Sequence, residues 1–521
     1  MAKDEKDGEE GEASEKKQEA DPPAEVEDAP VPLSFFQTLK TYPRSFWMGC
    51  IIEMFERLAW YGNRVVLPIY ICQADEPGGL HFTQAQKSSI YGTFAFVAAT
   101  VPMVSGGLAD RYGYKALIRI YVVLNILAFV LMANVRSYPA FFGSYLIIAV
   151  GNSLFKPAIQ GTLAQSMDKR TSSVGWGLFY WVVNVGGAIG PPFAGILHIM
   201  GWSYVFYGCA VITLLNFFLL WTYPNVESGA EKKPLFDVLK NTILNLADRR
   251  LLAIVVIFSG FWTMLYQLWD FMPNFYADWV DSSGFVKSVG VIPSFLTQET
   301  ARGIQLKQEN ALNLNSVMIV CFVIAASYLV RKMRVLTAMT MGFVIATFGN
   351  VVFGMSTSVY AVFLGIFLFS CGEMLTGPKK TEYFALIAPK GKKALYLGYV
   401  NIPVALGQVF GATIVAKWYG NYGEKAVLSL KYLATKTEAH GPGTWDGQTS
   451  SLEAFVGVPR KAAAAKLGEV LQKDAPSIND LLWSEYQPYR IWFIFAAVGF
   501  VSIIGMLAYA RQSRKWKEMD V

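Results

Sequence analysis

Residues 51–66 read IIEMFERLAWYGNRVV, which is part of an apolar segment that runs from about residue 46 to residue 71. The segment is long enough to cross a bilayer as a helix. It nevertheless contains four charged side chains, Glu53, Glu56, Arg57 and Arg64. Each charge at bilayer depth costs roughly 2.5–3.5 kcal/mol on insertion scales. A helix that only anchors a protein would not carry four of them, so we expect these side chains to face a polar interior.

The spacing of these charges follows the turn of a helix. Glu53 and Arg57 are four residues apart, and Glu56, Trp60 and Arg64 follow one another down the same side. A spanning helix with one charged and aromatic face needs a hydrated interior to point it at. The pattern therefore indicates a transport pathway.

The composition is that of a polytopic membrane protein. The chain has 521 residues, of which 53% are hydrophobic and 16% charged, whereas soluble domains carry about a quarter charged residues. The three histidines show no metal-ligand spacing, and the sequence has no nucleotide-binding loop and no nucleophile–base pair. We expect neither an enzyme, nor a metal site, nor a cofactor. The five cysteines fall mostly in apolar runs and are predicted to be free thiols.

A window of about 19 residues predicts about twelve membrane spans in an all-α protein. They lie near residues 46–71, 83–109, 114–135, 139–166, 173–199, 201–223, 250–272, 312–331, 335–355, 359–388, 392–419 and 487–510.

The spans and the composition divide the chain into predicted parts. Residues 1–32 hold twelve acids and four lysines with few large apolar residues, which is typical of disorder. The predicted parts are a disordered acidic tail at 1–40, an N-terminal six-helix bundle at 41–223, a linker at 224–249, a C-terminal six-helix bundle at 250–510 and a basic tail at 511–521. Long outer loops at 273–311 and 420–485 are predicted to form short helices.

Basic residues fall in alternate connections, while the loops at 72–82 and 355–359 have no Lys or Arg. The positive-inside rule then places both termini, and the linker, in the cytoplasm. We expect the chain in the plasma membrane, or in the inner membrane of a Gram-negative cell. Two six-helix halves joined by a cytoplasmic linker are typical of a major-facilitator-type transporter, which binds its substrate between the halves near the midplane.

The second span is followed by GGLADRYGYK, residues 106–115. This stretch resembles the cytoplasmic-loop signature of the major facilitator superfamily, with Tyr114 in place of the first of two basic residues. Glycines let helices approach and turn, and Asp110 and Arg111 offer opposite charges near a helix end. We predict that this pair takes part in gating, as a latch that holds one conformation and releases in another.

Three further charges fall inside predicted spans: Lys156, Asp270 and Glu373. If they share a cavity, Arg64 and Lys156 form its positive end and Glu373 its negative end. That arrangement is complementary to a zwitterion. Two interpretations stay open for Asp270, which lies either in the cavity or in water at the outer end of its helix. Arg57 is either a coupling residue or a structural partner of Glu53.

Aromatic and amide side chains complete the predicted binding site. Trp60, Tyr61 and Tyr91 fall on spans expected to line the cavity, and aromatic walls with polar tips suit variable side chains. Asn184, beside Gly186 and Gly187, is placed to bond a peptide-like group.

Four of these stretches resemble motifs of the proton-dependent oligopeptide transporter family. They are Glu53-x-x-Glu56-Arg57-x-x-x-Tyr61-Gly62, Gly151-Asn152-x-Leu154-Phe155-Lys156-Pro157, Phe179-Tyr180-Trp181 through Asn184, and Gly372-Glu373 with Pro378. The resemblance covers most of residues 46–419. It implies inward symport of small peptides driven by the proton gradient.

By that resemblance, Glu53, Glu56 and Arg57 serve proton coupling. Arg64 and Lys156 hold the peptide carboxylate and Glu373 the amino group. Tyr61, Tyr91 and Asn184 contact the peptide itself.

The sequence departs from the family pattern in span seven. Members usually carry an acid just before the Gln of this span, but here Tyr266 precedes Gln267, and the nearest acid is Asp270. Gln267 and Asp270 are therefore candidate substrate-binding residues, and either Asp270 partners Lys156 or the coupling differs. The linker is also too short for the two extra helices of many bacterial members.

The leading hypothesis is a proton-coupled symporter of di- or tripeptides or similar small zwitterions. Its expected partners are that substrate, protons and the lipid bilayer, with no nucleic acid. One alternative is a symporter of another small anion, nitrate-like or organic. A second is a membrane sensor that binds such ligands without moving them.

Overall fold

The protein is described from a computed structural model that covers residues 35–168, 171–226, 248–330, 333–388, 396, 399–441 and 443–514. The chain has two units. Residues 1–41 form the first, in which Phe35–Thr41 is helix α1, and residues 42–521 form the second. The predicted tail at 1–40, linker at 224–249 and basic tail at 511–521 fall mainly outside the described residues, so those assignments stay predictions.

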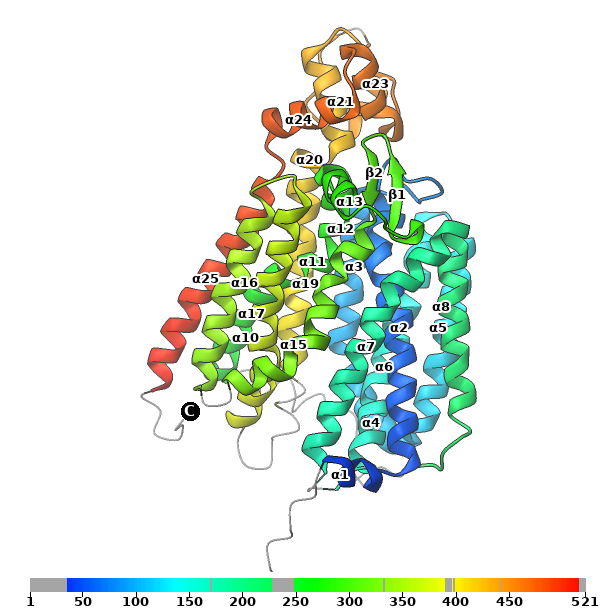
Figure 1. Cartoon of the computed structure of the whole chain (residues 1–521), viewed down its shortest axis with the longest axis vertical. Helices are drawn as coiled ribbons and strands as arrows, with labels where there is room; N and C mark the ends of the chain where they lie inside the picture. Colours follow the sequence, from blue (N-terminus) through cyan, green and yellow to red (C-terminus); the bar gives the residue numbers. More distant parts are fainter. Residues whose placement is uncertain are drawn as a thin grey trace, which may run out of the picture. The chain divides into compact units, whose positions relative to one another are not determined.

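The second unit is built almost entirely of helices (Figure 1). The helices of its first half are α2 (Arg44–Cys72), α3 (Gln84–Thr100), α4 (Pro102–Tyr112), α5 (Tyr114–Asn134), α6 (Tyr138–Gln165), α7 (Ser172–Met200) and α8 (Trp202–Leu219).

The second half has long helices interrupted by short elements. Its long helices are α10 (Arg249–Leu265), α15 (Leu314–Val330), α16 (Val335–Phe353), α17 (Val359–Leu386), α19 (Ile402–Ile414) and α25 (Arg490–Ser513). Its short elements are α11 (Gln267–Asp270), α12 (Met272–Trp279), α13 (Ser283–Val289), η1 (Ser294–Leu296), β1 (Thr297–Thr300), β2 (Gly303–Leu306), α14 (Gln308–Leu312), η2 (Tyr399–Asn401), η3 (Val415–Tyr419), α20 (Gly420–Tyr422), α21 (Lys425–Lys436), η4 (Thr449–Ser451), α22 (Leu452–Val456), η5 (Arg460–Ala462), α23 (Ala463–Leu471) and α24 (Ala475–Tyr486).

Ten helical segments of the described residues are long and apolar enough to cross a membrane. The two other predicted spans are helical but differ from ordinary spans. Helix α2 carries four charges in its middle, and the second span is divided between α3 and α4, where Pro102 lacks the backbone N–H that would continue the hydrogen-bond ladder. The predicted all-α membrane fold of about twelve spans is confirmed.

The outer surfaces of the helices suit a lipid environment. On α25, Val501 and Ile504 are 69% and 67% exposed, while Ile503 and Met506 are buried. Large exposed apolar side chains in such numbers would be unfavourable in water. The helix therefore presents one apolar face to the protein and another to lipid.

Each half of the second unit has its own apolar core. Buried side chains between residues 52 and 223 pack mainly into two clusters, and those between residues 251 and 509 pack into one large and two small clusters. Each half is therefore packed around its own core, and the halves meet where α3 packs against α19 and α7 against α15.

The long loops contain more than the predicted short helices. Residues 425–486, here called the cap, form α21 to α24 as predicted. The prediction is wrong for residues 297–306, where β1 and β2 pair antiparallel, with Thr297 opposite Leu306. Gly303 has φ +90°, which a residue without Cβ adopts easily, and this permits the tight turn. Figure 1 shows the hairpin and the cap beyond the same end of the helices.

Helices α2 and α7 approach each other closely at paired glycines. A Cβ on Gly190 would lie 2.7 Å from both the Gly62 nitrogen and the Leu58 carbonyl oxygen. These are backbone atoms that cannot rotate away. Small residues allow such contacts between membrane helices, and the contact fixes the charged face of α2 inside its half.

We expect Gly190→Ala to destabilise the protein by about 1–3 kcal/mol because the added methyl group has no space. Gly177→Ala on the same helix is the control, because a Cβ there meets nothing within 4 Å. Thermal unfolding in detergent compares the two variants. Equal melting temperatures would contradict the close-approach argument.

Candidate functional site

A cavity of about 470 Å³ lies between the two halves of the second unit. Its first-half wall includes Arg57, Trp60, Tyr61 and Arg64 of α2 and Lys156 of α6. Its second-half wall includes Trp262, Tyr266, Trp269, Glu373 and Gln408. Six predicted site residues (Arg57, Trp60, Tyr61, Arg64, Lys156 and Glu373) thus line one chamber.

Helical spacing produces a compact ion network on α2. The Arg57 Nε lies 3.4 Å from Glu53 Oε1, one turn away. The Arg57 guanidinium also donates two hydrogen bonds to the Glu56 carboxylate. Lys156 Nζ donates to Glu53 Oε1 from the neighbouring α6. Both carboxylates are buried. Two acids and two bases balance here, which is how a low-dielectric interior tolerates buried charge.

A second ion pair joins the two halves. Arg64 on α2 contacts Asp270 on α11, and the two side chains are only 4% and 5% exposed. Arg64 also donates to the Tyr145 hydroxyl at 3.1 Å, and its guanidinium lies 4.6 Å from the Tyr91 ring centre. Arg64 is therefore enclosed by aromatic rings on its own half and by one carboxylate from the other.

The Arg64–Asp270 pair shows which of the two interpretations of Asp270 is correct. The residue is buried between the halves, so the interpretation that it lies in water at a helix end is wrong. The suggestion that Asp270 partners Lys156 is also contradicted, because Lys156 reaches Glu53 and Asp270 reaches Arg64. The helix break between α11 and α12, at Phe271, puts the carboxylate beside α2.

Glu373 occupies the opposite wall of the cavity. Its Oε2 accepts a hydrogen bond from Asn315 Nδ2 at 3.0 Å. Lys380 follows seven residues later on α17, with its ammonium 4.3 Å from the Trp262 ring centre. Within the described residues, no ion pair of Glu373 is formed, so this carboxylate remains available to a ligand cation.

Four predicted binding residues do not line the cavity in this conformation: Asp270, which pairs with Arg64, and Tyr91, Gln267 and Asn184. Tyr91 lies behind Arg64, and Gln267 is buried with its amide donating to the Thr263 carbonyl at 2.7 Å. Asn184 donates to the Tyr180 carbonyl of its own helix at 2.8 Å. Direct contact of these four side chains with a substrate would need a rearrangement.

The predicted latch is only partly described. The Asp110 side chain lies outside the described residues. Arg111 is exposed at the end of α4, with its guanidinium 5.7 Å from the Tyr112 ring centre. Gly113 has φ +89° and separates α4 from α5. A gating role for Asp110 and Arg111 therefore stays a prediction.

Sequence reasoning missed a set of buried polar residues that joins the halves, here called the closing layer: Gln73, Lys87, Asn274 and Asp278. Lys87 Nζ donates to the Asp270 carbonyl at 3.1 Å and to Asn274 Oδ1 at 2.8 Å. Gln73 Nε2 donates to Asp278 Oδ1 at 2.8 Å. Lys87 falls near the start of its span, where a lysine usually faces water. Nothing in the sequence distinguished Lys87 from a lysine that faces water.

The comparisons with known proteins agree with this architecture. The family model described as Major Facilitator Superfamily matches residues 49–412. The uncharacterized transporter YclF of Bacillus subtilis (strain 168) is 29% identical over 181 residues, which is 33% of this chain and 36% of that protein. The peptide transporter YePEPT of Yersinia enterocolitica subsp. palearctica serotype O:3 (strain YE-P4) is 32% identical over 162 residues, 30% of this chain and 31% of that one.

A solved structure shares the fold over nearly the whole chain. It is a POT family transporter in complex with 5-aminolevulinic acid, which matches with a TM-score of 0.63 and 17% identity over 92% of this chain and 99% of that chain. The membrane-spanning helices, the cavity lined by both halves and the family match together define the protein as a multi-pass membrane transporter. The chain belongs to the Major Facilitator Superfamily, and its resemblance to the proton-dependent oligopeptide transporters is supported by these relatives.

We expect Asp270→Asn to destabilise the protein by about 3–5 kcal/mol because it leaves the Arg64 guanidinium buried without a counter-charge. A matched cycle compares the wild type with Arg64→Leu, Asp270→Leu and the variant that carries both changes. The double variant buries no unpaired charge and is expected to cost less than either single change. Thermal unfolding of the four proteins measures this coupling. Additive effects would show that the two side chains do not act as a pair.

Proposed function

We propose that this protein is a proton-coupled symporter of small zwitterions, such as di- and tripeptides, that works by alternating access. The observation that carries the proposal is the cavity itself. Lys156 and Arg64 lie on the wall of one half and Glu373 on the wall of the other. A ligand with a carboxylate at one end and an ammonium at the other would bridge the two halves.

The ion pairs leave a specific place for each end of such a ligand. Arg64 forms a buried ion pair with Asp270, whereas the Lys156 side chain is 32% exposed and pairs with Glu53. A ligand carboxylate would therefore approach Lys156. The ligand ammonium would approach Glu373, whose only hydrogen-bond partner in the described residues is the Asn315 amide. Aromatic rings between the two ends, such as Tyr61 and Trp269, accept variable side chains.

Competition for Lys156 supplies a coupling mechanism. A proton on Glu53 removes the charge that holds Lys156 and frees its ammonium for the ligand carboxylate. Protonation and ligand binding then favour each other, because linkage between two sites is reciprocal. Arg57 keeps Glu56 neutralised while Glu53 changes state.

The closing layer forms the gate together with two neighbouring contacts between the halves. On the side of the 72–82 loop the halves are joined by Arg64–Asp270, by Gln73–Asp278, and by Lys307, which donates to the Gly195 carbonyl at 3.1 Å. Opening this end requires all of these contacts to separate. With both termini in the cytoplasm, as the basic loops predict, the closed end faces outward. We place the protein in the plasma membrane, or in the inner membrane of a Gram-negative cell.

The relatives' names support this choice of substrate. One relative is named a peptide transporter, and a structure of the same fold is described in complex with 5-aminolevulinic acid, a compound with an amino and a carboxyl group.

Uptake into proteoliposomes with an imposed acid-outside gradient tests the proposal. We expect accumulation of L-alanyl-L-alanine by the wild-type protein, and a loss of about tenfold or more in its affinity for Glu373→Gln, because a charge-assisted hydrogen bond is lost. Glu382→Gln, an exposed carboxylate on the same helix, is the control. Normal dipeptide uptake by Glu373→Gln would instead favour a carrier of simple anions, and binding without uptake would favour a sensor.

The coupling mechanism makes a separate prediction for Glu53→Gln. The amide cannot hold Lys156 by charge, so dipeptide binding should become tighter and lose its dependence on pH. Accumulation driven by the pH gradient should disappear, while exchange of labelled for unlabelled dipeptide should continue. Binding titrations at pH 5.5 and 7.5, with uptake and exchange assays, measure these effects. Wild-type accumulation by the variant would exclude Glu53 from coupling.

A further inference from the structure

A second and larger cavity lies on the other side of the closing layer, outside the binding site described above. Its volume is about 1210 Å³, and Gln73 of the closing layer is part of its lining. The 72–82 loop, the β1–β2 hairpin and the cap each contribute a wall. We call this cavity the antechamber. Both the hairpin and the cap come from the long loops of the second half.

The walls of the antechamber are held in place by one short helix, α12. Arg302 of the hairpin donates to the carbonyls of Ala277 and Val280 at 2.6 and 2.9 Å. The start of the cap is fixed by Asp278, which accepts from the Lys425 backbone nitrogen at 3.3 Å, and by the Trp279 indole, which donates to the Gly423 carbonyl just before the cap at 3.0 Å. Gln73 of the 72–82 loop donates to Asp278. Three distant segments are thus positioned relative to each other, as a pre-organised site requires.

Two cations that line this cavity, Lys425 and Arg302, form no contact ion pair in the described residues, although Asp75 and Asp278 lie within electrostatic range of both. Lys425, at the start of α21, lies within electrostatic range of Arg302, and the two like charges repel each other. In the described part of the chain the Lys425 ammonium forms no hydrogen bond or ion pair. The Arg302 guanidinium, in the same described residues, bonds only to backbone carbonyls. Burial lowers the pKa of the Arg302 guanidinium despite Asp278 and Asp281 nearby.

The nearest carboxylate is already occupied. Asp278 accepts hydrogen bonds from Gln73, from the Tyr419 hydroxyl at 2.6 Å and from the Lys425 backbone nitrogen at 3.3 Å. It does not bond the Lys425 ammonium. An anionic group placed between Lys425 and Arg302 would relieve their repulsion, and that place is inside the cavity.

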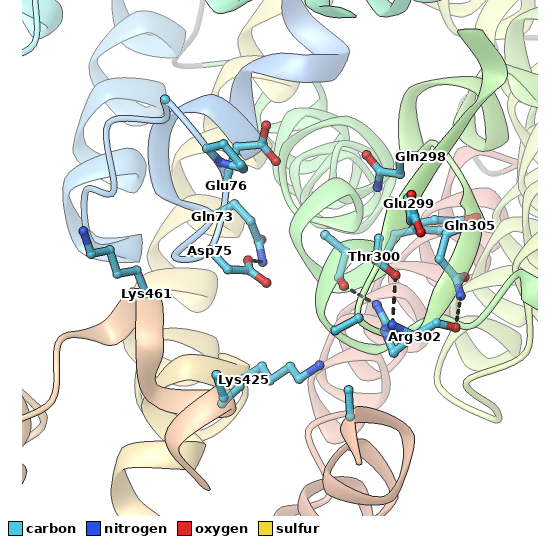
Figure 2. Close-up of a pocket in the computed structure, with 18 of the residues that line it drawn as sticks. Gln73, Asp75, Glu76, Gln298, Glu299, Thr300, Arg302, Gln305, Lys425 and Lys461 are labelled. Atoms are coloured by element: carbon cyan, nitrogen blue, oxygen red, sulfur yellow. Dashed lines mark hydrogen bonds between the residues drawn. The ribbon is translucent and has the colours of Figure 1, made fainter. Parts of the chain in front are cut away.

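An acidic group faces the same cavity from another segment. Asp75 is exposed and accepts one hydrogen bond, from the Gln73 amide at 2.8 Å. Figure 2 shows Asp75, Lys425 and Arg302 on three different segments around one space, with Lys461 further along the cap. Two other acids of this cavity are engaged: Glu76 contacts His198 at 3.1 Å, and Glu469 contacts Lys466 at 3.0 Å. Glu299, Lys461 and Lys473 also line the cavity.

We propose that the antechamber is a capture site for a small zwitterion, with its carboxylate between Lys425 and Arg302 and its ammonium at Asp75. The proposal rests on the proposed function, because the captured molecule is of the class that the central cavity accepts. A ligand held there lies directly outside the closing layer and enters when that layer opens. The cap and hairpin thereby raise the ligand's local concentration at the closed gate.

Calorimetric titration of the purified full-length protein with L-alanyl-L-alanine tests the capture site. The central cavity is disabled by Lys156→Ala with Glu373→Gln, and binding that remains is assigned to the antechamber. We expect this double variant to keep one site, and the further change Lys425→Ala to weaken that site about tenfold. Lys425→Arg should restore it. Lys436→Ala, on the same helix but outside the cavity, should have no effect.

Three outcomes would overturn the proposal. They are absence of binding to the central-cavity variant, retention of that binding after Lys425→Ala, and equal binding of acetate, which would mark a simple anion site. Thermal unfolding of each variant verifies that it is folded. Failure of the proposed function is seen separately, as absence of dipeptide uptake by wild-type proteoliposomes, and leaves the titration of the antechamber readable.

Discussion

The ion pair between Arg64 and Asp270 is the contact on which the described conformation depends. Each half of the second unit has its own apolar core, and helices of the two halves also pack against each other, α3 against α19 and α7 against α15. The pair places one full charge from each half in a site that is 4–5% exposed. Burying either charge alone is strongly unfavourable, and burying both together is tolerated. The two halves are therefore held in register at this point as long as the pair persists.

The need to pair every buried charge also determines which charged residues are neutralised in the cavity. Because Asp270 neutralises Arg64, and Glu53 and Glu56 neutralise Arg57 and Lys156, the resting cavity carries little net charge on its first-half wall. A membrane protein can exchange such partners at small cost, whereas it cannot leave them unpaired. Glu53 is the carboxylate with two cationic partners, so its protonation releases the most interactions. Ligand binding at Lys156 is thereby linked to loss of the Lys156–Glu53 ion pair between α6 and α2.

Much of the fold could be predicted from the sequence, because a membrane span is recognised from the apolar residues of that segment alone. The i,i+4 relation of Glu53 and Arg57 was predicted from helical spacing and is found as a contact of 3.4 Å. The convergence of Arg64, Lys156 and Glu373 on one cavity also followed, since charges at bilayer depth have few other places to go. The partners of these charges did not follow. Which acid faces Arg64 depends on the helix break at Phe271, and Lys87 at the start of α3 gave no signal of its burial.

The central claim is that the Arg64–Asp270 ion pair stabilises the closed end, so that its loss favours conformations in which the other contacts there also separate. Distances between spin labels test it most directly, with one label at Ser137Cys in the first half and one at Lys287Cys in the second, after Cys321 and Cys371 are replaced by alanine. The account predicts a short distance distribution for this background and a shift toward longer distances when Asp270→Asn is added. An unchanged distribution in the folded Asp270→Asn protein would contradict it.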